Sequence, residues 1–245
     1  MDNTIYVGLS RQMILERELD ITANNLANVD TTGFKFESMI SNDDSVTMPT
    51  PGIAPAAVHF VADAGVARDF TQGSLVQTNA PLDVAVDGKG FFTINTAAGP
   101  RYTRDGRFKL DSGGRIVTQD GDPVDGGGDI VLDPTKGGVT IAPNGIISQQ
   151  GQNVGKISVV TFDSLAALSK DGNNQYRNDS NLTPTPAANA QVRQGFLESS
   201  NVEPVRQITR LIEIERAYDA VANMMSSTQD LSDSAIQRLG AVNPS

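Results

Sequence analysis

The feature that most constrains this chain is a long apolar stripe near its C-terminus, between Glu203 and Leu239. Its members recur at alternating spacings of three and four: Leu211, Ile214, Tyr218, Val221, Met225, Thr228, Ser232, Ala235 and Leu239. This is the a/d period of a coiled coil, sustained over about four heptads. Such a helix extends roughly 50 Å, whereas a compact globule of 245 residues has a radius of gyration of only about 18 Å. The stripe therefore needs a partner of matching length.

A second amphipathic segment, residues 3–28, can supply part of that partner. Its heptad-like stripe is formed by Ile5, Leu15, Leu19 and Leu26, with Leu9 flanking it. Gly33 suits the left-handed conformation that follows a helix end. A helix of roughly 40 Å cannot cover the whole C-terminal face, which broadens where Met224, Leu231 and Ile236 flank the stripe. The pattern favours contact with other subunits; the alternative is that both helices merely cover the rest of the chain.

The middle of the chain alternates with a period of two. Short strands with Gly and Asp at their joints indicate an antiparallel β domain over residues 69–199. We expect a hairpin that joins Tyr102–Arg104 to Arg107–Leu110 across Asp105-Gly106, and a last strand over Gln191–Glu198. Pro and Asp punctuate residues 39–68, which we interpret as a connector.

The predicted fold class is therefore α+β. Residues 1–38 and 200–245 are expected to pair as a coiled-coil-like inner domain, and residues 69–199 to form a mostly antiparallel central domain.

The composition excludes several functions. A net charge of −10 argues against nucleic-acid binding, which needs clustered Lys and Arg. The chain has no Cys, and no apolar run approaches the ~20 residues that cross a bilayer. It begins without the basic and apolar regions of a cleaved signal peptide. We expect no cofactor and no membrane span.

The sequence gives only weak evidence for catalytic or metal-binding residues. His59 is the only histidine and lies in the connector, and no G-x-S-x-G nucleophile motif accompanies it. Asp83 and Asp87 share one face of a strand and are better explained as its wet side. A calcium loop is suggested by Asp120, Asp122, Asp125 and Asp129, but the ligand spacing does not fit an EF-hand. We predict no catalytic residue and no metal site; a secreted calcium- or carbohydrate-binding β protein remains the alternative from another class.

Several motifs carry a resemblance to a known family. Residues 21–28 read ITANNLAN and are followed by Thr32-Gly33-Phe34-Lys35. The middle contains PLDVAVDGKGFF at 81–92 and YTRDG at 102–106, and QGFLESSNV occupies 194–202. In this order, the blocks closely resemble the bacterial flagellar axial proteins of the rod and hook. Within that family, the run IYVGLSRQ at 5–12 resembles the proximal-rod F-type subfamily most, with the distal-rod G-type subfamily as the alternative.

The resemblance implies a structural subunit of the flagellar basal-body rod rather than an enzyme. It would assemble with copies of itself and with other rod proteins, after export through the flagellar type III apparatus without cleavage. The implied subunit or helix interface consists of Ile5, Leu9, Leu15, Leu19, Leu26, Leu211, Ile214, Tyr218, Val221, Met224, Met225, Leu231 and Ile236. The implied family motif consists of Asn24, Asn25, Leu26, Ala27, Asn28, Thr32, Gly33, Phe34 and Lys35.

Overall fold

The computed structural model describes residues 2–48, 56–128 and 130–240, with the side chains of 2–5, 41–64 and 238–240 left out of that description. The chain divides into two compact units. The first contains residues 1–27, 37–67 and 203–245, and the second contains residues 28–36 and 68–202.

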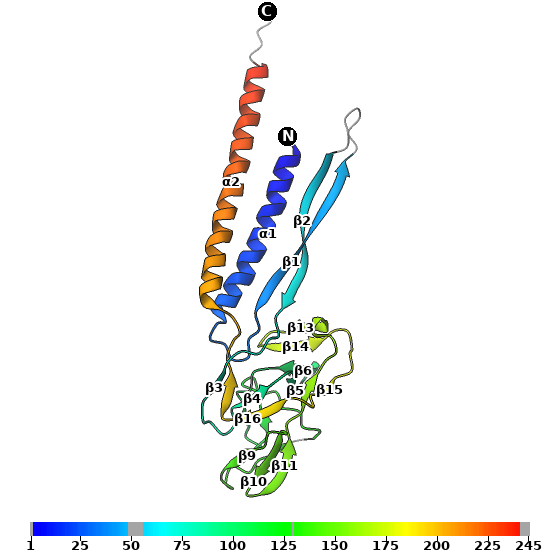
Figure 1. The fold of residues 1–245 in the computed structure, drawn as a ribbon, viewed down its shortest axis with the longest axis vertical. Coiled ribbons are helices and arrows are strands. Elements are labelled where there is room, and N and C mark those ends of the chain that lie inside the picture. The colour runs from blue at the N-terminus through cyan, green and yellow to red at the C-terminus, as the bar shows by residue number, and fades with distance from the viewer. Residues whose placement is uncertain (1, 49–55, 129, 241–245) are drawn as a thin grey trace, which may run out of the picture. The chain divides into compact units, whose positions relative to one another are not determined.

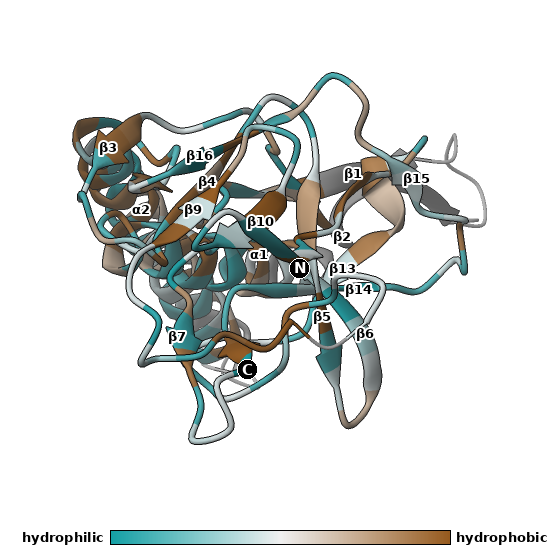
Figure 2. Ribbon diagram, turned by 90° about the horizontal axis from the view of Figure 1, so that it is seen from below, coloured by the Kyte–Doolittle hydropathy of each residue, from teal (hydrophilic) through white to brown (hydrophobic). Residues whose placement is uncertain are grey.

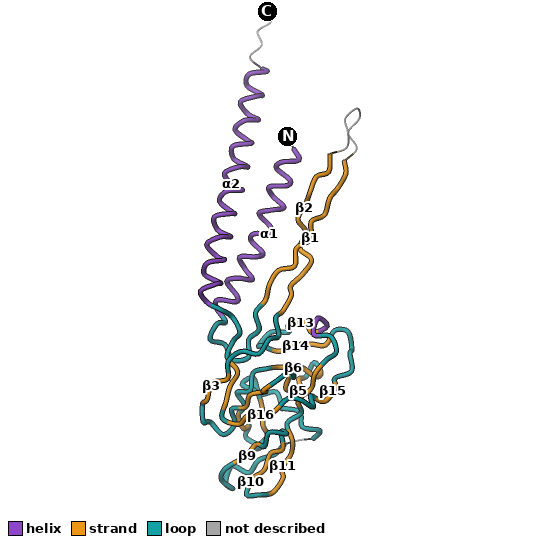
Figure 3. Tube along the Cα trace, viewed as in Figure 1, coloured by secondary structure: helices purple, strands orange, loops and turns teal. Residues whose placement is uncertain are grey.

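The first unit consists of two helices and one long hairpin (Figures 1 and 3). Helix α1 spans Asp2–Ala27 and α2 spans Pro204–Gly240, each within one residue of the bounds predicted from periodicity. The strands β1 (Glu37–Met48) and β2 (Ala56–Arg68) pair with each other and occupy the segment interpreted as a connector. The two helices are antiparallel, because Glu18 of α1 pairs with Arg210 of α2 while Gly8 lies beside Met225.

Helix α1 lies between α2 and β1 (Figure 1), and this placement explains its burial. Leu15 and Ile14 are almost fully buried, although they are consecutive in the sequence. Successive residues lie about 100° apart around a helix, so the two side chains point in different directions and pack against different neighbours. The side-chain amide of Asn25 makes two hydrogen bonds to the backbone of Glu37, the first residue of β1. Its Nδ2 donates to the Glu37 carbonyl at 2.7 Å, and its Oδ1 accepts from the Glu37 N–H at 2.9 Å.

The second unit is built from short antiparallel strands. Its largest sheet has the order β13-β14-β6-β5-β12-β15, with β5 (Phe91–Thr96) and β6 (Gly99–Thr103) at its centre. The other members are β12 (Val159–Thr161), β13 (Leu168–Lys170), β14 (Gln175–Asn178) and β15 (Thr185–Pro186). A three-stranded sheet contains β9 (Val139–Ile141), β10 (Ile146–Gln149) and β11 (Gln152–Lys156).

Three further pairs complete the strands of this unit. They are β4 (Val84–Asp87) with β16 (Gln191–Gln194), β3 (Leu75–Gln77) with β17 (Phe196–Glu198), and β7 (Lys109–Leu110) with β8 (Ile116–Val117). The expected last strand is thus two strands with different partners, separated by Gly195 at φ +75°. A short 3-10 helix occupies Leu165–Ala167.

Two apolar clusters form the interior of the second unit. Successive side chains of a strand point to opposite faces, and the consecutive residues Phe91 and Phe92 accordingly belong to different clusters. The larger cluster contains two phenylalanines, Phe92 and Phe108, among aliphatic residues that include Val84 and Val86 of β4. The strand β4 is correspondingly hydrophobic in Figure 2. In the smaller cluster Phe91 meets the Tyr176 ring edge-on at 5.9 Å between centroids.

The hairpin expected at Asp105-Gly106 is wrong. The strand β6 pairs with β5, and β7 pairs with β8 across the turn at residues 111–114. Gly106 instead crosses β4 closely: its carbonyl accepts from the Val84 N–H at 3.0 Å, and a Cβ at position 106 would lie 1.6 Å from the Val84 oxygen. The glycine is needed for close backbone approach rather than for a two-residue turn.

Candidate functional site

The contact between α1 and α2 contains much of the predicted helix interface. Leu15 and Ile214 are 2% and 1% exposed, and Leu19, Leu26, Leu211, Val221 and Met225 are partly buried. Gly8 lies in the same contact, where an added Cβ would lie 2.8 Å from Cγ of Met225. The absence of a side chain at position 8 therefore lets Met225 approach the α1 backbone. The side chain of Ile5 lies outside the described residues.

Other residues of the predicted interface are exposed in the single chain. Leu231 and Ile236 are 70% and 67% exposed, and Leu9, Tyr218 and Met224 are also exposed. Large apolar side chains at this exposure mark surfaces that bind another molecule when they cluster. The broad part of α2 is thus apolar and uncovered by the described residues of this chain.

An ion pair links the C-terminal half of α1 to the N-terminal part of α2. Arg210 Nε donates to Glu18 Oε1 at 2.8 Å, and Arg210 Nη1 lies 3.1 Å from Glu213 Oε2. Hydrogen bonding to Glu18 raises the pKa of Arg210 further above its ordinary value. Because Arg210 is half exposed, this pair sets the register of the helices more than it stabilises them.

The motif that follows α1 enters the second unit, where its backbone is held tightly. Gly33 takes φ +68° and donates its N–H to the Glu198 carbonyl at 2.7 Å. A Cβ here would lie 2.5 Å from the carbonyl carbon of Arg104, so Gly33 is required both by its conformation and by its surroundings. Phe34 is buried, and the Lys170 ammonium lies 4.6 Å from its ring centroid.

The remaining motif residues occupy different surroundings. Asn24 and Ala27 are exposed on α1, whereas Asn25 is buried where it hydrogen-bonds to β1. Asn28 accepts from the Thr31 hydroxyl at 3.1 Å and from the Thr31 N–H, which shapes the turn after the helix. Thr32 accepts at its carbonyl from the Asn174 side chain at 2.6 Å.

A buried ionic junction lies next to this turn, and we define it as Lys35, Glu198 and Arg104. Glu198 Oε1 is 2.5 Å from Lys35 Nζ, and its Oε2 is 2.9 Å from Arg104 Nη1. The side chains of Lys35 and Glu198 are fully buried, and that of Arg104 is 3% exposed. Lys35 Nζ also donates to the Thr71 carbonyl at 2.6 Å, and the Gly73 N–H donates to Glu198 Oε1 at 3.0 Å.

Asn201 connects the segment that follows α1 to the segment that follows β2. Its Oδ1 accepts from the Phe36 N–H at 2.7 Å, and its Nδ2 donates to the carbonyls of Asp69 and Thr71 at 2.9 and 3.1 Å. The segments that leave α1, leave β2 and lead into α2 are therefore joined to one another inside the second unit.

The junction places two cations against one carboxylate. Burial lowers the pKa of Lys35 below its ordinary value, although Glu198 opposes the shift, and Arg104 lowers it further. Burial likewise lowers the pKa of Arg104, again against the effect of Glu198. Glu198 is thus the group on which both buried cations depend.

Sequence reasoning included Lys35, Glu198 and Arg104 in motifs but did not bring them together. Lys35 and Glu198 are 163 positions apart, and no local period connects them. The available signal was a lysine between two phenylalanines, Phe34 and Phe36, which suggests a buried amine. The exposed apolar residues Val205, Ile208 and Ile212 of α2 were also missed.

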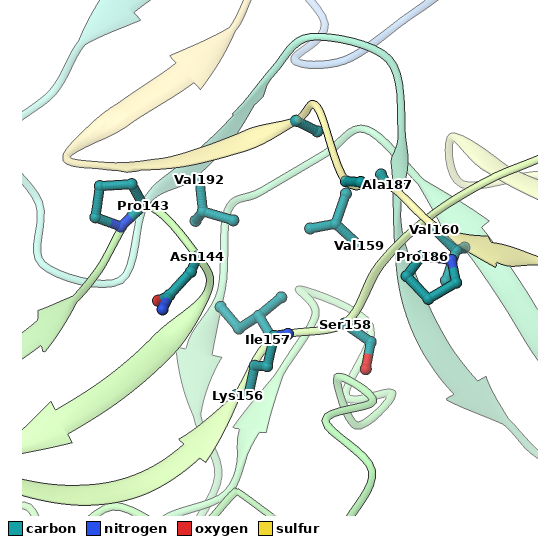
Figure 4. A pocket seen from close by; sticks show the side chains of 12 residues that line it. Pro143, Asn144, Lys156, Ile157, Ser158, Val159, Val160, Pro186, Ala187 and Val192 are labelled. Atoms are coloured by element: carbon teal, nitrogen blue, oxygen red, sulfur yellow. The ribbon is translucent and has the colours of Figure 1, made fainter.

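A cleft of about 330 Å³ opens on the second unit. Figure 4 shows Ile157, Val159 and Val192 around the same space. Its lining is completed by Pro143, Asn144, Lys156, Ser158, Val160, Pro186, Ala187, Ala188 and Ala190. Lys156 is the one titratable residue among these, so the lining offers no pair of groups for acid–base chemistry.

Three of the carboxylates considered for catalysis or calcium, those of Asp87, Asp122 and Asp125, have protein partners. Asp87 pairs with Arg193 at 2.7 Å, and Asp122 accepts from Gln175 at 3.3 Å. Over the described residues, no group of three His, Cys, Asp or Glu side chains is arranged to hold a metal ion. The side chain of His59 and all of Asp129 lie outside the described residues. Neither helix, as far as it is described, is long and apolar enough to cross a membrane.

Comparison with models of known protein families gives three matches along the chain. The model "Flagella basal body rod protein" matches residues 5–35, "Flagellar hook protein FlgE/F/G D1 domain" matches 85–149, and "Flagellar basal body rod FlgEFG protein C-terminal" matches 193–238. These matches include α1 with its motif, part of the second unit, and most of α2.

Individual relatives agree over nearly the whole chain. The flagellar basal-body rod protein FlgF of Caulobacter vibrioides is 51% identical over 99% of this chain and 100% of its own length. FlgF of Mesorhizobium japonicum is 37% identical over 98% and 99%, and the rod protein FlgG of Bacillus subtilis is 31% identical over 94% and 97%. The chain belongs to the flagellar basal-body rod protein family. Of these three relatives, the two named FlgF are the more similar.

Proposed function

We propose that the chain is an F-type structural subunit of the flagellar basal-body rod. It assembles helically with copies of itself and with adjacent proximal and distal rod subunits, and the assembly acts as a drive shaft in motility. Its role requires no catalysis. The observation that carries this proposal is the exposed apolar surface of α2 at Met224, Leu231 and Ile236.

The lengths of the helices support contact with neighbours. Helix α2 has 37 residues and α1 has 26, so at 1.5 Å per residue α2 exceeds its partner by roughly 16 Å. Leu231 and Ile236 lie in the C-terminal part of α2, beyond Met225, which meets Gly8 of α1. A long amphipathic helix without cover on its apolar face gains most of its stability from packing, and adjacent subunits supply that packing.

The proposal assigns a layer to each part of the chain. Residues 1–38 and 200–245 form the inner axial domain, and residues 69–199 form an outer layer. Residues 39–68, which contain β1 and β2, connect the two layers along the chain. The division of the chain supports the separation of the helices from the central β region, because both helices belong to one unit and residues 68–202 to the other; the unit with the helices also contains residues 37–67.

The rod location implies a route out of the cytoplasm. We place the protein in the part of the basal body that crosses the periplasm, after export by the type III apparatus without removal of an N-terminal segment. Mass spectrometry of subunits from isolated basal bodies tests this directly. An N-terminal peptide that starts at Met1 or Asp2 is expected, and a start at any residue after Asp2 would contradict uncleaved export.

The substitution Leu231→Asp tests the assembly role. Leu231 is largely exposed in the single chain, so a charge there changes monomer stability little, by about 0.5 kcal/mol or less. In an assembled rod the same charge is buried without a partner. We expect a folded monomer, no complete rod and loss of motility in a strain that carries only this variant.

The matched control is Gln229→Asp, a charge on an exposed polar residue of the same helix. It should leave motility close to wild type. Normal motility with Leu231→Asp would show that this face of α2 is not buried in the rod.

A further inference from the structure

Helices α1 and α2 each carry an exposed apolar stripe at their N-terminal ends. On α1 the stripe is Tyr6, Leu9 and Met13; on α2 it is Val205, Ile208 and Ile212. Both have the spacing i, i+3, i+7. We call them the α1 stripe and the α2 stripe.

The two stripes are followed by the same charge pattern. Glu16, Arg17 and Asp20 lie at i+10, i+11 and i+14 after Tyr6, and Glu215, Arg216 and Asp219 lie at the same offsets after Val205. The most deeply buried large side chains of the two helices obey the same offset, since Leu15 corresponds to Ile214. The antiparallel pair is therefore a near repeat of one helical pattern, with one stripe near each end.

Both stripes face away from the contact within the chain. At about 100° per residue, the middle of the α1 stripe lies roughly 150° around the helix from Leu15, and the α2 stripe lies at a similar angle from Ile214. Met224 and Leu231 lie on another side of α2, so the α2 stripe is a separate surface.

The two stripes of one chain cannot touch. The contacts of Glu18 with Arg210 and of Gly8 with Met225 place Ile208 at about the level of residue 21 or 22 of α1. Leu9 is thus about 20 Å away from Ile208 along the helix axis, at 1.5 Å per residue. A neighbour shifted by this distance brings its own α1 stripe level with the α2 stripe.

We infer that the α1 stripe of one copy docks against the α2 stripe of a second copy of this chain. The inference rests on the proposed rod function and names a contact within it. In copies that point the same way the contacting helices are antiparallel, which sets Leu9 against Ile208, with Tyr6 near Ile212 and Met13 near Val205. In such a pair one copy keeps a free α2 stripe and the other keeps a free α1 stripe, so the contact is head-to-tail and leads to open growth rather than a closed dimer.

The size of the contact explains why a free chain can expose it. Six side chains cover far less than the roughly 1,200–2,000 Å² of a stable protein interface. The stripe contact therefore forms as one of several contacts in an assembly.

Cysteine cross-linking tests the pairing in the full chain, which has no native cysteine to interfere. Purified Leu9→Cys and Ile208→Cys proteins are mixed at high concentration and treated with a short bismaleimide. A cross-linked dimer is expected from the mixture and not from either variant alone. The control replaces Ile208→Cys with Gln229→Cys, an exposed position of α2 that lies 21 residues farther along and about 60° around the helix, and should give several times less dimer.

Three results would overturn the pairing. The first is an equal yield with Gln229→Cys, and the second is no dimer at the highest concentration at which the protein stays soluble. The third is cross-linking of Leu9→Cys in isolated basal bodies to a different polypeptide and never to a second copy. Any of these results leaves the rod function standing if Leu231→Asp still abolishes motility; normal motility with Leu231→Asp counts against the rod function itself.

Discussion

The substitution Glu198→Gln removes the one negative charge from a buried junction that holds two positive ones. The carboxylate of Glu198 is fully buried and lies within 2.5 and 2.9 Å of Lys35 and Arg104. Glutamine keeps the size and one acceptor oxygen but leaves both cations without a counter-charge. Breaking a buried ion pair by removal of one partner costs about 3–5 kcal/mol, a large part of the roughly 5–15 kcal/mol that stabilises a folded domain.

The structure also ranks the substitutions within the junction. Lys35→Met removes one of two cations and leaves Glu198 paired with Arg104, so its main cost is the lost hydrogen bonds to Glu198 and to the Thr71 carbonyl. We expect about 1–3 kcal/mol, less than for Glu198→Gln. The double variant should cost less than the sum of the two single variants, because both act on the same interaction.

Urea unfolding of the full chain measures these costs. The chain has no Trp and four Tyr. Tyr102 and Tyr176 are buried in the second unit, whereas Tyr6 and Tyr218 of the first unit are exposed in the folded chain, so the change in tyrosine fluorescence on unfolding comes mainly from the second unit. The control is Asp87→Asn, which breaks the half-exposed pair with Arg193 and should cost no more than about 1 kcal/mol. The reasoning is refuted if Glu198→Gln costs no more than this control, or if Lys35→Met costs more than Glu198→Gln.

Three further predictions use other parts of the structure. Raising the pH from neutral toward 10.5 should increase the unfolding free energy of the wild type relative to that of Lys35→Met. The reason is that the pKa of Lys35 is lowered in the folded state, so the unfolded state binds more protons in this pH range. Urea titrations at several pH values measure the difference, and an opposite slope would contradict it. Gly33→Ala should destabilise the second unit by more than Gly127→Ala, since both glycines have positive φ but only Gly33 has backbone atoms where a Cβ would lie; thermal unfolding decides, and about 1–2 kcal/mol is expected for the control. Val221→Asp should abolish motility while the second unit keeps its near-UV circular dichroism, because Val221 belongs to the first unit; simultaneous loss of both signals would show that the units do not fold independently.

The helices were predictable because their signals are local. Alternating spacings of three and four define α2 without knowledge of any other segment, and Pro204 marks its first turn. The same holds for the β character of the middle, where period two and Gly-rich joints recur over short distances. The bounds of both helices were accurate for this reason, and the apolar width of α2 at Leu231 and Ile236 follows from residue spacing alone.

The failures arose where one residue pattern serves two geometries. Asp105-Gly106 has the composition of a hairpin turn, yet its glycine is required by the backbone of Val84, which approaches from a different strand. The expected strand over 191–198 is continuous in pattern, but Gly195 turns it so that its halves pair with β4 and β3. Pairing partners of short strands depend on packing, which local sequence does not specify.

The sequence by itself determined that this chain has a long amphipathic helix at each end, a β region between them and an apolar helix face that needs a partner. Periodicity is sufficient for these features because each depends on residues only a few positions apart. The tertiary structure alone decided that Lys35, Arg104 and Glu198 share one buried site and that the stripes at Leu9 and Ile208 face outward. Such contacts join residues far apart in the chain, and their geometry and burial arise only when the whole fold brings them together.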